Sequence, residues 1–344
     1  MSVLRANILI TGGTGYLGSA LVRHLQHRLG NRIGIRVLVR NAAKGAHLQS
    51  LGSVETVEGN LDDPASLALA TRNIDTVFHV AGLVSFEQLA YRKLYQTNVL
   101  GTRHLVDACL INKVRRLVHT SSTAAVGSLG NGSLSNERAA FQDWQHRIGY
   151  SESKYLAELE VLRGVAEGLD AVMLNPSVVF GYDDYAETLY ENAASGLLLD
   201  VFKGKLPYHP PGGTGVVDVN DFVKACTLAW EKGKTGERYI ISAENLSYRA
   251  MYEQVAGFPL GRGRGTGALS KWLGRFFGLG AELFGAITRQ TVPLALDTVR
   301  LSERLLYYDN QKSRTELGMS YRPFAETIKT VLHKHHLLYQ SQFT

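Results

Sequence analysis

The sequence predicts an α/β protein with a doubly wound parallel sheet and a smaller C-terminal region that binds the substrate. Two observations support this fold class. Short β-branched segments alternate with helical patterns over the first half of the chain, and a glycine-rich turn follows the first of these segments. The 344 residues, of which 45% are apolar and 20% charged, are enough for a sizeable core.

Seven short segments are expected to be strands because they are rich in β-branched residues and lie between helical patterns. These segments are 7–10, 35–39, 54–58, 76–80, 116–120, 171–175 and 238–241. The first helix is predicted from the helical spacing of Leu17, Leu21 and Leu25, with Gly30 as its stop. Longer helices are expected over 91–111 and 150–167, which completes the alternation of a βαβ chain.

The stretch ILITGGTGYLG (8–18) places four glycines between the first strand and the first helix. Gly12 allows a tight turn, Gly15 lets the backbone approach a pyrophosphate, and Gly18 lets the helix pack closely. The pattern therefore predicts a dinucleotide site at the helix start, the alternative being glycines that only cap a tight turn.

A second motif, YSESK, places Tyr150 and Lys154 four residues apart on an expected helix, so that both share one face. An ammonium group beside a phenol favours the phenolate and brings the phenol toward acid–base chemistry. Ser121 and Ser122 follow the expected strand 116–120 and could bind a substrate oxygen. Taken alone, the Tyr–Lys spacing could also belong to a solvated helix face.

Together these motifs resemble the extended short-chain dehydrogenase/reductase family. The spacing TGxxGxxG, the YSESK motif, NVLGT (98–102), HVAG (79–82) and LNPSVVFG (174–181) carry the resemblance. The segments GVVDVNDFVKA and YYDNQKSRTELGMSYRPFAETI are similar to the branch of dihydroflavonol reductases and 3β-hydroxysteroid dehydrogenases. Two positions depart from the family pattern, since Asn60 stands where an aspartate is usual and Gly82 where the branch often has alanine.

The resemblance implies a set of site residues. Its catalytic members are Ser122, Tyr150 and Lys154, with Ser121 as the weaker choice for the serine. Asn98 would be a fourth member, although hydrogen bonds to nearby backbone would explain it equally well. The implied cofactor-binding residues are Gly12, Thr14, Gly15, Tyr16, Leu17, Gly18, Arg40, Lys44, Asn60, Leu61, Val80, Ala81, Gly82, Asn98, Tyr150, Lys154, Pro176 and Val179.

The second strand suggests which nicotinamide cofactor is used. It ends in Arg40, with Lys44 following, and no acidic residue lies between 35 and 46. An acidic side chain at this place suits the ribose hydroxyls of NAD, whereas arginine suits a 2′-phosphate. The sequence therefore predicts NADP(H), unless Arg40 is only a solvated charge.

The expected reaction is the NADPH-dependent reduction of a ketone or aldehyde to an alcohol, with Tyr150 as proton donor. Lys154 would tune the phenol and hold the ribose, and Ser122 would anchor the carbonyl oxygen. A sugar-nucleotide epimerase or dehydratase of the same superfamily is the alternative. A non-catalytic NADP sensor is a third reading, disfavoured because such proteins typically lose the tyrosine or lysine.

The chain is expected to divide into a dinucleotide-binding domain over 1–181, to which 215–243 returns, and a substrate region over 182–214 and 244–344. Within the latter, 269–289 shows an amphipathic helical stripe. This segment could pack on the core, lie on a membrane surface, or cover the substrate. The last reading favours a bulky apolar substrate.

Composition limits the partners and the location. The net charge of +6 comes from scattered residues, so no nucleic acid is expected, and the substrate is a small carbonyl or alcohol. Cys109 and Cys226 lack metal-site spacing, so neither a metal nor a disulfide is expected. No leader and no apolar run of about 20 residues is visible, which predicts a cytoplasmic protein without membrane association. The helices at 91–111 and 150–167 suggest a homodimer, since they form dimer faces in similar proteins.

Overall fold

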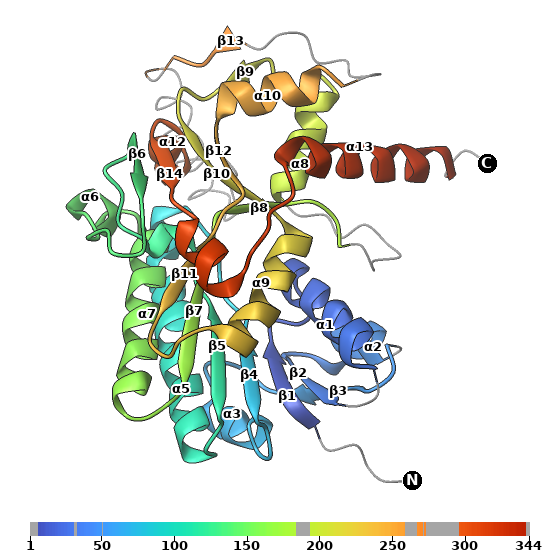
Figure 1. Cartoon of the computed structure of the whole chain (residues 1–344), viewed down its shortest axis with the longest axis vertical. Coiled ribbons are helices and arrows are strands. Elements are labelled where there is room, and N and C mark those ends of the chain that lie inside the picture. Colours follow the sequence, from blue (N-terminus) through green and yellow to red (C-terminus); the bar gives the residue numbers. More distant parts are fainter. Residues whose placement is uncertain are drawn as a thin grey trace.

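A seven-stranded parallel sheet forms the centre of the N-terminal half in the computed structural model, which describes residues 6–30, 33–49, 51–183, 193–258, 267–270, 272 and 296–341 (Figure 1). The strand order is β11-β7-β5-β4-β1-β2-β3. The strands are β1(Ala6–Thr11), β2(Gly34–Val39), β3(Val54–Glu58), β4(Thr76–His79), β5(Arg116–Thr120), β7(Ala171–Pro176) and β11(Arg238–Ile241). All seven expected segments are confirmed to within one residue at each end, as is the doubly wound fold.

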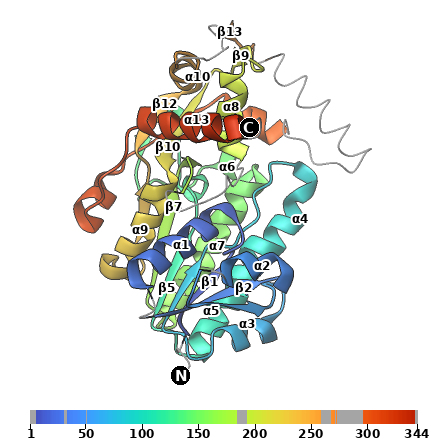
Figure 2. The same ribbon diagram turned by 90° about the vertical axis from the view of Figure 1, so that its right-hand side faces the viewer.

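Helices cover both faces of this sheet, as a parallel sheet requires (Figures 1 and 2). On one face lie α1(Tyr16–Leu29), α2(Ala42–Gln49) and α9(Val219–Lys232), which share one apolar core with the strands. On the other lie α3(Pro64–Ala70), α5(Gly101–Ile111) and α7(Gly149–Ala166), with a second core. Burial on both faces explains why the strands read as continuous apolar runs.

The predicted helix ends are confirmed, but one predicted helix is not continuous. The residue after α1 is Gly30, with a φ of 57°, and α7 ends just before Gly168, with a φ of 101°. The helix expected over 91–111 consists instead of α4(Tyr91–Leu94), a π-helical turn over Tyr95–Leu100, and α5. The wider turn contains Asn98, whose carbonyl accepts a hydrogen bond from the Thr102 hydroxyl at 2.6 Å.

A second, smaller sheet lies beyond the carboxyl ends of the seven strands (Figure 1). Its order is β12-β10-β14-β6, with β8 beside β10. An apolar cluster around Phe180, Val216 and Ile328 packs it against its helices. The elements of this region and the remaining short ones are α6(Asp143–His146), β6(Asn131–Ser135), β8(Val178–Phe180), α8(Ala193–Phe202), β9(Tyr208–His209), β10(Gly213–Asp218), β12(Glu244–Ser247), α10(Tyr248–Ala256), β13(Gly267–Ala268), α12(Leu296–Ser302), β14(Leu305–Tyr308) and α13(Phe324–Ser341).

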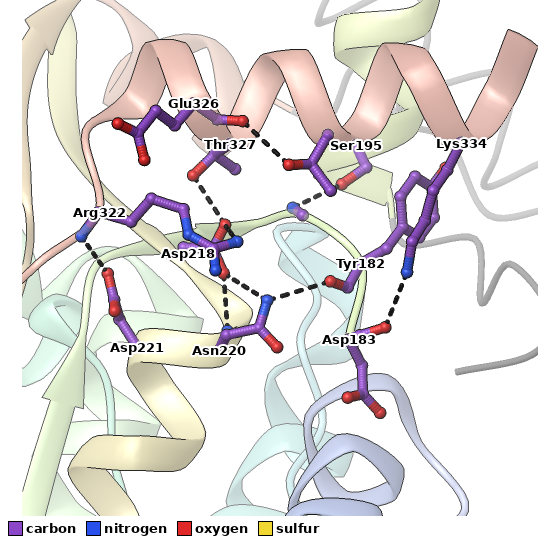
Figure 3. A network of polar contacts seen from close by, with 12 residues as sticks. Tyr182, Asp183, Ser195, Asp218, Asn220, Asp221, Arg322, Glu326, Thr327 and Lys334 are labelled. Carbon is purple, nitrogen blue, oxygen red and sulfur yellow. Dashed lines mark hydrogen bonds and ion pairs between the residues drawn. The ribbon is translucent and has the colours of Figure 1, made fainter. Parts of the chain in front are cut away.

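A polar network fastens the C-terminal helix α13 to the rest of the molecule (Figure 3). Its centre is Asp218, which is buried and accepts hydrogen bonds from the Thr327 hydroxyl at 2.7 Å and the Asn220 amide nitrogen at 2.8 Å. The Asn220 side chain also donates to the Tyr182 carbonyl, and Lys334 donates to the Asp183 carbonyl at 3.1 Å. The chain after β8 is thus bound to α9 and to α13.

The amphipathic stripe predicted over 269–289 lies outside the described residues, apart from 269–270 and 272. Its three readings therefore stay predictions. Among the helices that the structure describes, none combines the length and the apolar character needed to cross a membrane.

Candidate active site

The predicted site residues gather at the carboxyl edge of the seven-stranded sheet. The strand order reverses between β1 and β4, and ligands of such sheets bind at this edge where the order reverses. Thr11, His79 and Thr120 are the last residues of β1, β4 and β5, and the glycine loop, the HVAG segment and Ser122 follow them. Parallel pairing therefore brings together motifs that are more than a hundred residues apart in the sequence.

The glycine loop has the tight geometry predicted for two of its glycines. Gly12 has a φ of 73°, and a Cβ atom there would lie 2.6 Å from the Ala81 backbone nitrogen. A Cβ atom on Gly18 would lie 2.1 Å from the Gly12 carbonyl oxygen. The first turn of α1 therefore lies directly against the turn after β1, and any side chain at either position would separate them.

The start of α1 is open, as an anion site requires. Gly15 is the N-cap residue and provides no side-chain cap, so it does not compete with a ligand for the amide groups of the first turn. A Cβ atom on Gly15 would have only the Gly12 carbonyl oxygen nearby, at 3.4 Å. Thr14, Tyr16 and Leu17 flank it and are half-buried. The loop therefore fits a dinucleotide phosphate, although the role of each residue stays a prediction.

Tyr16 also links the glycine loop to the second region. Its hydroxyl donates to the Gly181 carbonyl at 2.8 Å, and Gly181 in turn donates its amide to the Ser195 hydroxyl on α8 at 3.2 Å. Two turns further along α1, Arg23 forms an ion pair with Asp183. Two residues of α1 thus hold the segment that leads from β8 into the C-terminal part.

Ser122, Tyr150 and Lys154 converge at the end of β5. Tyr150 and Lys154 lie one turn apart on α7, and the Ser122 hydroxyl is close enough to the Tyr150 phenol to lower its pKa. Lys154 is buried, and its ammonium donates to the Thr120 carbonyl at 2.9 Å. The Ser121 hydroxyl, by contrast, is buried without a hydrogen-bond partner among the described residues. Of the two candidate serines, Ser122 is therefore the one that faces the tyrosine.

Burial dominates the electrostatics of this trio. It raises the pKa of the Tyr150 phenol above its ordinary 10.0, and the Ser122 hydroxyl only partly opposes this. Burial lowers the pKa of Lys154 from 10.5 to about 8, with Glu158 acting in the opposite direction. Burial therefore opposes the formation of a phenolate at Tyr150, whereas a role of Lys154 in lowering the pKa of the phenol stays a prediction.

Asn98 lies beside this trio and uses its side chain to hold neighbouring elements. Its amide exchanges two hydrogen bonds with the Leu83 backbone, at 2.7 Å and 3.0 Å, and donates to the Ser153 hydroxyl at 3.0 Å. Ser153 in turn donates to the Tyr150 carbonyl. Of the two readings of Asn98, hydrogen bonding to nearby backbone describes these contacts.

The expected adenosine side lies at the ends of β2 and β3. Arg40 directly follows β2 and is exposed, and among the described residues its guanidinium has no recorded partner. Lys44 lies on α2, and its side chain is outside the described part. Asn60 is exposed after β3, whereas Leu61 is buried against Gly101 of α5. The contact of either residue with a cofactor stays a prediction.

The remaining predicted contacts lie on the loops after β4 and β7. Gly82 is nearest to the trio, since a Cβ atom there would lie 3.7 Å from the Lys154 ammonium nitrogen. Val80 and Ala81 connect it to β4. Pro176 ends β7 and is buried, and Val179 lies on β8, paired with Val217 of β10. The structure therefore brings Gly82 close to Lys154, and places Val179 on the second sheet.

Sequence reasoning missed two features of this site. Phe86 lies with its ring edge against Tyr150, at a centroid distance of 5.3 Å and an angle of 70°. His79 is buried and hydrogen-bonded on both ring nitrogens, to Thr11 and to Thr102. Phe86 has no motif around it, whereas His79 was visible as a polar residue that ends an otherwise apolar strand.

Fold and glycine loop together define a Rossmann-type protein with a candidate dinucleotide site. The sequence profile of the NAD-dependent epimerase/dehydratase family matches residues 8–242. The chain belongs to this family, the extended short-chain dehydrogenases/reductases, and to its dihydroflavonol reductase-like branch. Members of the family bind NAD or NADP, and the uncapped start of α1 fits that group.

Three similar proteins support the assignment over nearly the whole chain. A Synechocystis protein provisionally named dihydroflavonol 4-reductase is 32% identical over 94% of this chain and 93% of its own. Sterol demethylase protein B of Methylococcus capsulatus is 31% identical over 90% and 92% of the two chains. The crystal structure of gox2253 has a TM-score of 0.77 at 28% identity, covering 96% of this chain and 98% of that one.

Proposed function

We propose that the protein is an NADPH-dependent reductase that converts a bulky, apolar ketone or aldehyde into an alcohol. The observation that carries the proposal is the convergence of Ser122, Tyr150 and Lys154 at the edge of the sheet where the glycine loop opens. A phenol, a hydroxyl and an ammonium group in this arrangement suit the transfer of a proton to a carbonyl oxygen.

Each member of the trio has a defined task. When bound, the nicotinamide supplies a hydride to the carbonyl carbon. Tyr150 gives its phenolic proton to the carbonyl oxygen, which becomes the hydroxyl of the product. Ser122 hydrogen-bonds the same oxygen and orients it, and Lys154 holds its charge beside the phenol and the ribose.

The protonation state of Tyr150 supports the reductive direction. Its pKa lies above the ordinary value because the phenol is buried, so the proton to be donated is present at neutral pH. The reverse reaction would need a phenolate as base, which burial disfavours. The form of Tyr150 that burial favours is therefore the one that reduction needs.

Arg40 supports NADPH as the reductant. Its exposed guanidinium follows β2, where a ribose 2′-phosphate would lie in a Rossmann site. A guanidinium forms charge-assisted, paired hydrogen bonds with a phosphate. No carboxylate lies between residues 35 and 46 to bind the free hydroxyls of NADH instead.

The surroundings of Tyr150 support an apolar substrate. Phe86 covers one edge of its ring, and the segment around it exposes Val84, Leu89 and Tyr91, at 62%, 82% and 42% of their surfaces. The relatives named dihydroflavonol 4-reductase and sterol demethylase protein B point to substrates with fused or linked rings. Of the three readings of 269–289, the one that covers the substrate belongs to the same proposal, as does the substrate region beyond 181.

The experiment is a panel of aldehydes and ketones, assayed by the consumption of NADPH and, separately, of NADH. Turnover of bulky apolar carbonyls with NADPH supports the proposal. The absence of any turnover, together with a cofactor that stays bound through purification and is identified by mass spectrometry, would instead indicate a sugar-nucleotide epimerase or dehydratase.

A further inference from the structure

His79 occupies a buried position between the two halves of the cofactor edge. It ends β4 and is only 1% exposed. Its Nδ1 atom lies 2.7 Å from the Thr11 hydroxyl at the end of β1, and its Nε2 atom lies 3.1 Å from the Thr102 hydroxyl on α5. The ring therefore bridges the strand that leads into the glycine loop and the helix that follows the π-helical turn.

The surrounding hydrogen bonds fix which ring nitrogen carries the proton. The Thr102 hydroxyl donates its single hydrogen to the Asn98 carbonyl at 2.6 Å, so toward His79 it can only accept. Nε2 must then be the protonated nitrogen. Burial keeps the ring neutral by lowering the pKa of His79 to about 3, so Nδ1 accepts from the Thr11 hydroxyl. Thr11 in turn accepts from the Ala81 amide at 3.3 Å.

The hydrogen bonds in this series all run in the same donor-to-acceptor direction. They lead from the Ala81 amide through Thr11, His79 and Thr102 to the Asn98 carbonyl, and each hydroxyl donates once. Asn98 is the residue whose side chain holds the Leu83 backbone, three residues before Phe86. The series of hydrogen bonds therefore ends at Asn98, the residue that holds the loop lying against Tyr150.

We propose that His79 is a positioning residue, which as the Nε2–H tautomer fixes the Asn98 turn and thereby the loop that places Phe86 against Tyr150. The proposal rests on the proposed function only for its kinetic consequence. Its structural part is that His79 is the Nε2–H tautomer within this series of hydrogen bonds. This tautomer can be measured on the protein without any substrate.

Two charged or titratable groups face His79. His119 of β5 lies beside it, with ring centroids 5.1 Å apart, and Lys154 of α7 acts on it electrostatically. From β1 and α5 it meets only the uncharged Thr11 and Thr102. His119 is equally buried, yet both of its nitrogens are without a hydrogen-bond partner among the described residues, which makes it a matched control.

The first experiment is nitrogen NMR of protein labelled at histidine, with the His79 signal assigned by its loss in His79→Gln. We expect the Nε2–H tautomer throughout about pH 5–8, the range in which an ordinary histidine titrates. A signal that titrates in this range, or one from the Nδ1–H tautomer, would overturn the proposal whatever the enzyme does.

The second experiment removes the link at Thr102, which lies away from the glycine loop. Thr102→Val keeps the shape but deletes the hydroxyl, and Thr102→Ser restores it. Because a displacement of about 1 Å can cost about 10²-fold in rate, we expect Thr102→Val to lower kcat by about 10–100-fold with KM for NADPH unchanged. Thr102→Ser should retain the kcat of the wild type.

The controls distinguish the positioning role of His79 from the proposed reductase function. His119→Leu, which removes a buried imidazole outside the chain, should keep wild-type kcat. A wild-type kcat in Thr102→Val would overturn the positioning role, and Thr102→Ala serves as the second variant if valine prevents folding. The wild-type enzyme could prove inactive on every carbonyl and still show the expected tautomer. That result would contradict the proposed function but would agree with the inferred hydrogen bonds of His79.

Discussion

The ring of Phe86 lies edge-on against the ring of Tyr150, with centroids 5.3 Å apart. The two residues belong to different elements, a loop after β4 and the helix α7, and Asn98 holds both of them through Leu83 and Ser153. The contact removes water from one side of the phenol, and burial in turn raises its pKa. A loop without any recognisable motif thus helps to set the chemistry of the predicted proton donor.

Tyr150→Phe tests the proton donor. The substitution removes one oxygen and keeps the ring against Phe86. General acid catalysis contributes about 10²–10⁴-fold, so kcat should fall by at least about 10²-fold while NADPH still binds. Tyr155→Phe on the same helix is the control, because its ring stacks on Phe141 and should remain stacked. Near-normal turnover in Tyr150→Phe would remove the residue from its proposed role.

Arg40→Asp tests the cofactor preference. A charge-assisted hydrogen bond contributes roughly 1.5–3 kcal/mol, so the Kd for NADPH should rise about 10–150-fold, with the Kd for NADH unchanged or lower. Titration calorimetry with both cofactors measures the two constants. Arg72→Asp, a reversal at another exposed arginine, controls for net charge. If the NADPH/NADH ratio stays constant in Arg40→Asp, the residue is only a solvated charge.

Gly15→Ala and Gly18→Ala separate ligand approach from packing. A methyl group on Gly18 meets the Gly12 carbonyl at 2.1 Å, so the backbone must shift, at a cost of about 1–3 kcal/mol in the free energy of unfolding. A methyl group on Gly15 meets only one atom, at 3.4 Å, and should cost about 1 kcal/mol or less.

The informative result is cofactor binding by Gly15→Ala. If the pyrophosphate lies against this glycine, the folded variant should bind NADPH much more weakly than the wild type. Denaturant unfolding and a binding titration on the same samples distinguish the two effects. Wild-type affinity in Gly15→Ala would place the phosphates elsewhere.

The buried ammonium of Lys154 should make the stability of the protein without cofactor depend on pH. Its pKa falls from 10.5 to about 8 because the ammonium is buried. Between these two values the unfolded chain binds more protons than the folded one, so the free energy of unfolding rises with pH across this window. Lys154→Met should lose that rise, which urea unfolding at several pH values would show. An equal rise in both proteins would mean that other groups cause it.

Local signals in the sequence were sufficient to predict the fold class, the seven parallel strands and the motifs of the site. These features depend on local signals: β-branched runs, glycines where the backbone must turn, and a Tyr–Lys pair whose spacing places both on one helix face. Gly12 and Gly18 could be read correctly because their constraint comes from the turn itself. The roles of Ser122 and Tyr150, by contrast, were predicted from the resemblance to the family.

Contacts between residues far apart in the sequence could not be predicted and became visible only in the packed structure. The interruption of the helix over 91–111, the use of the Asn98 side chain to hold Leu83, and the contact of Phe86 with Tyr150 all depend on neighbouring elements. The pKa of Tyr150 depends likewise on burial, which no spacing reveals. The reason is physical: a local pattern specifies the backbone and one face of each element, whereas hydrogen-bond partners and desolvation arise only when the elements pack together.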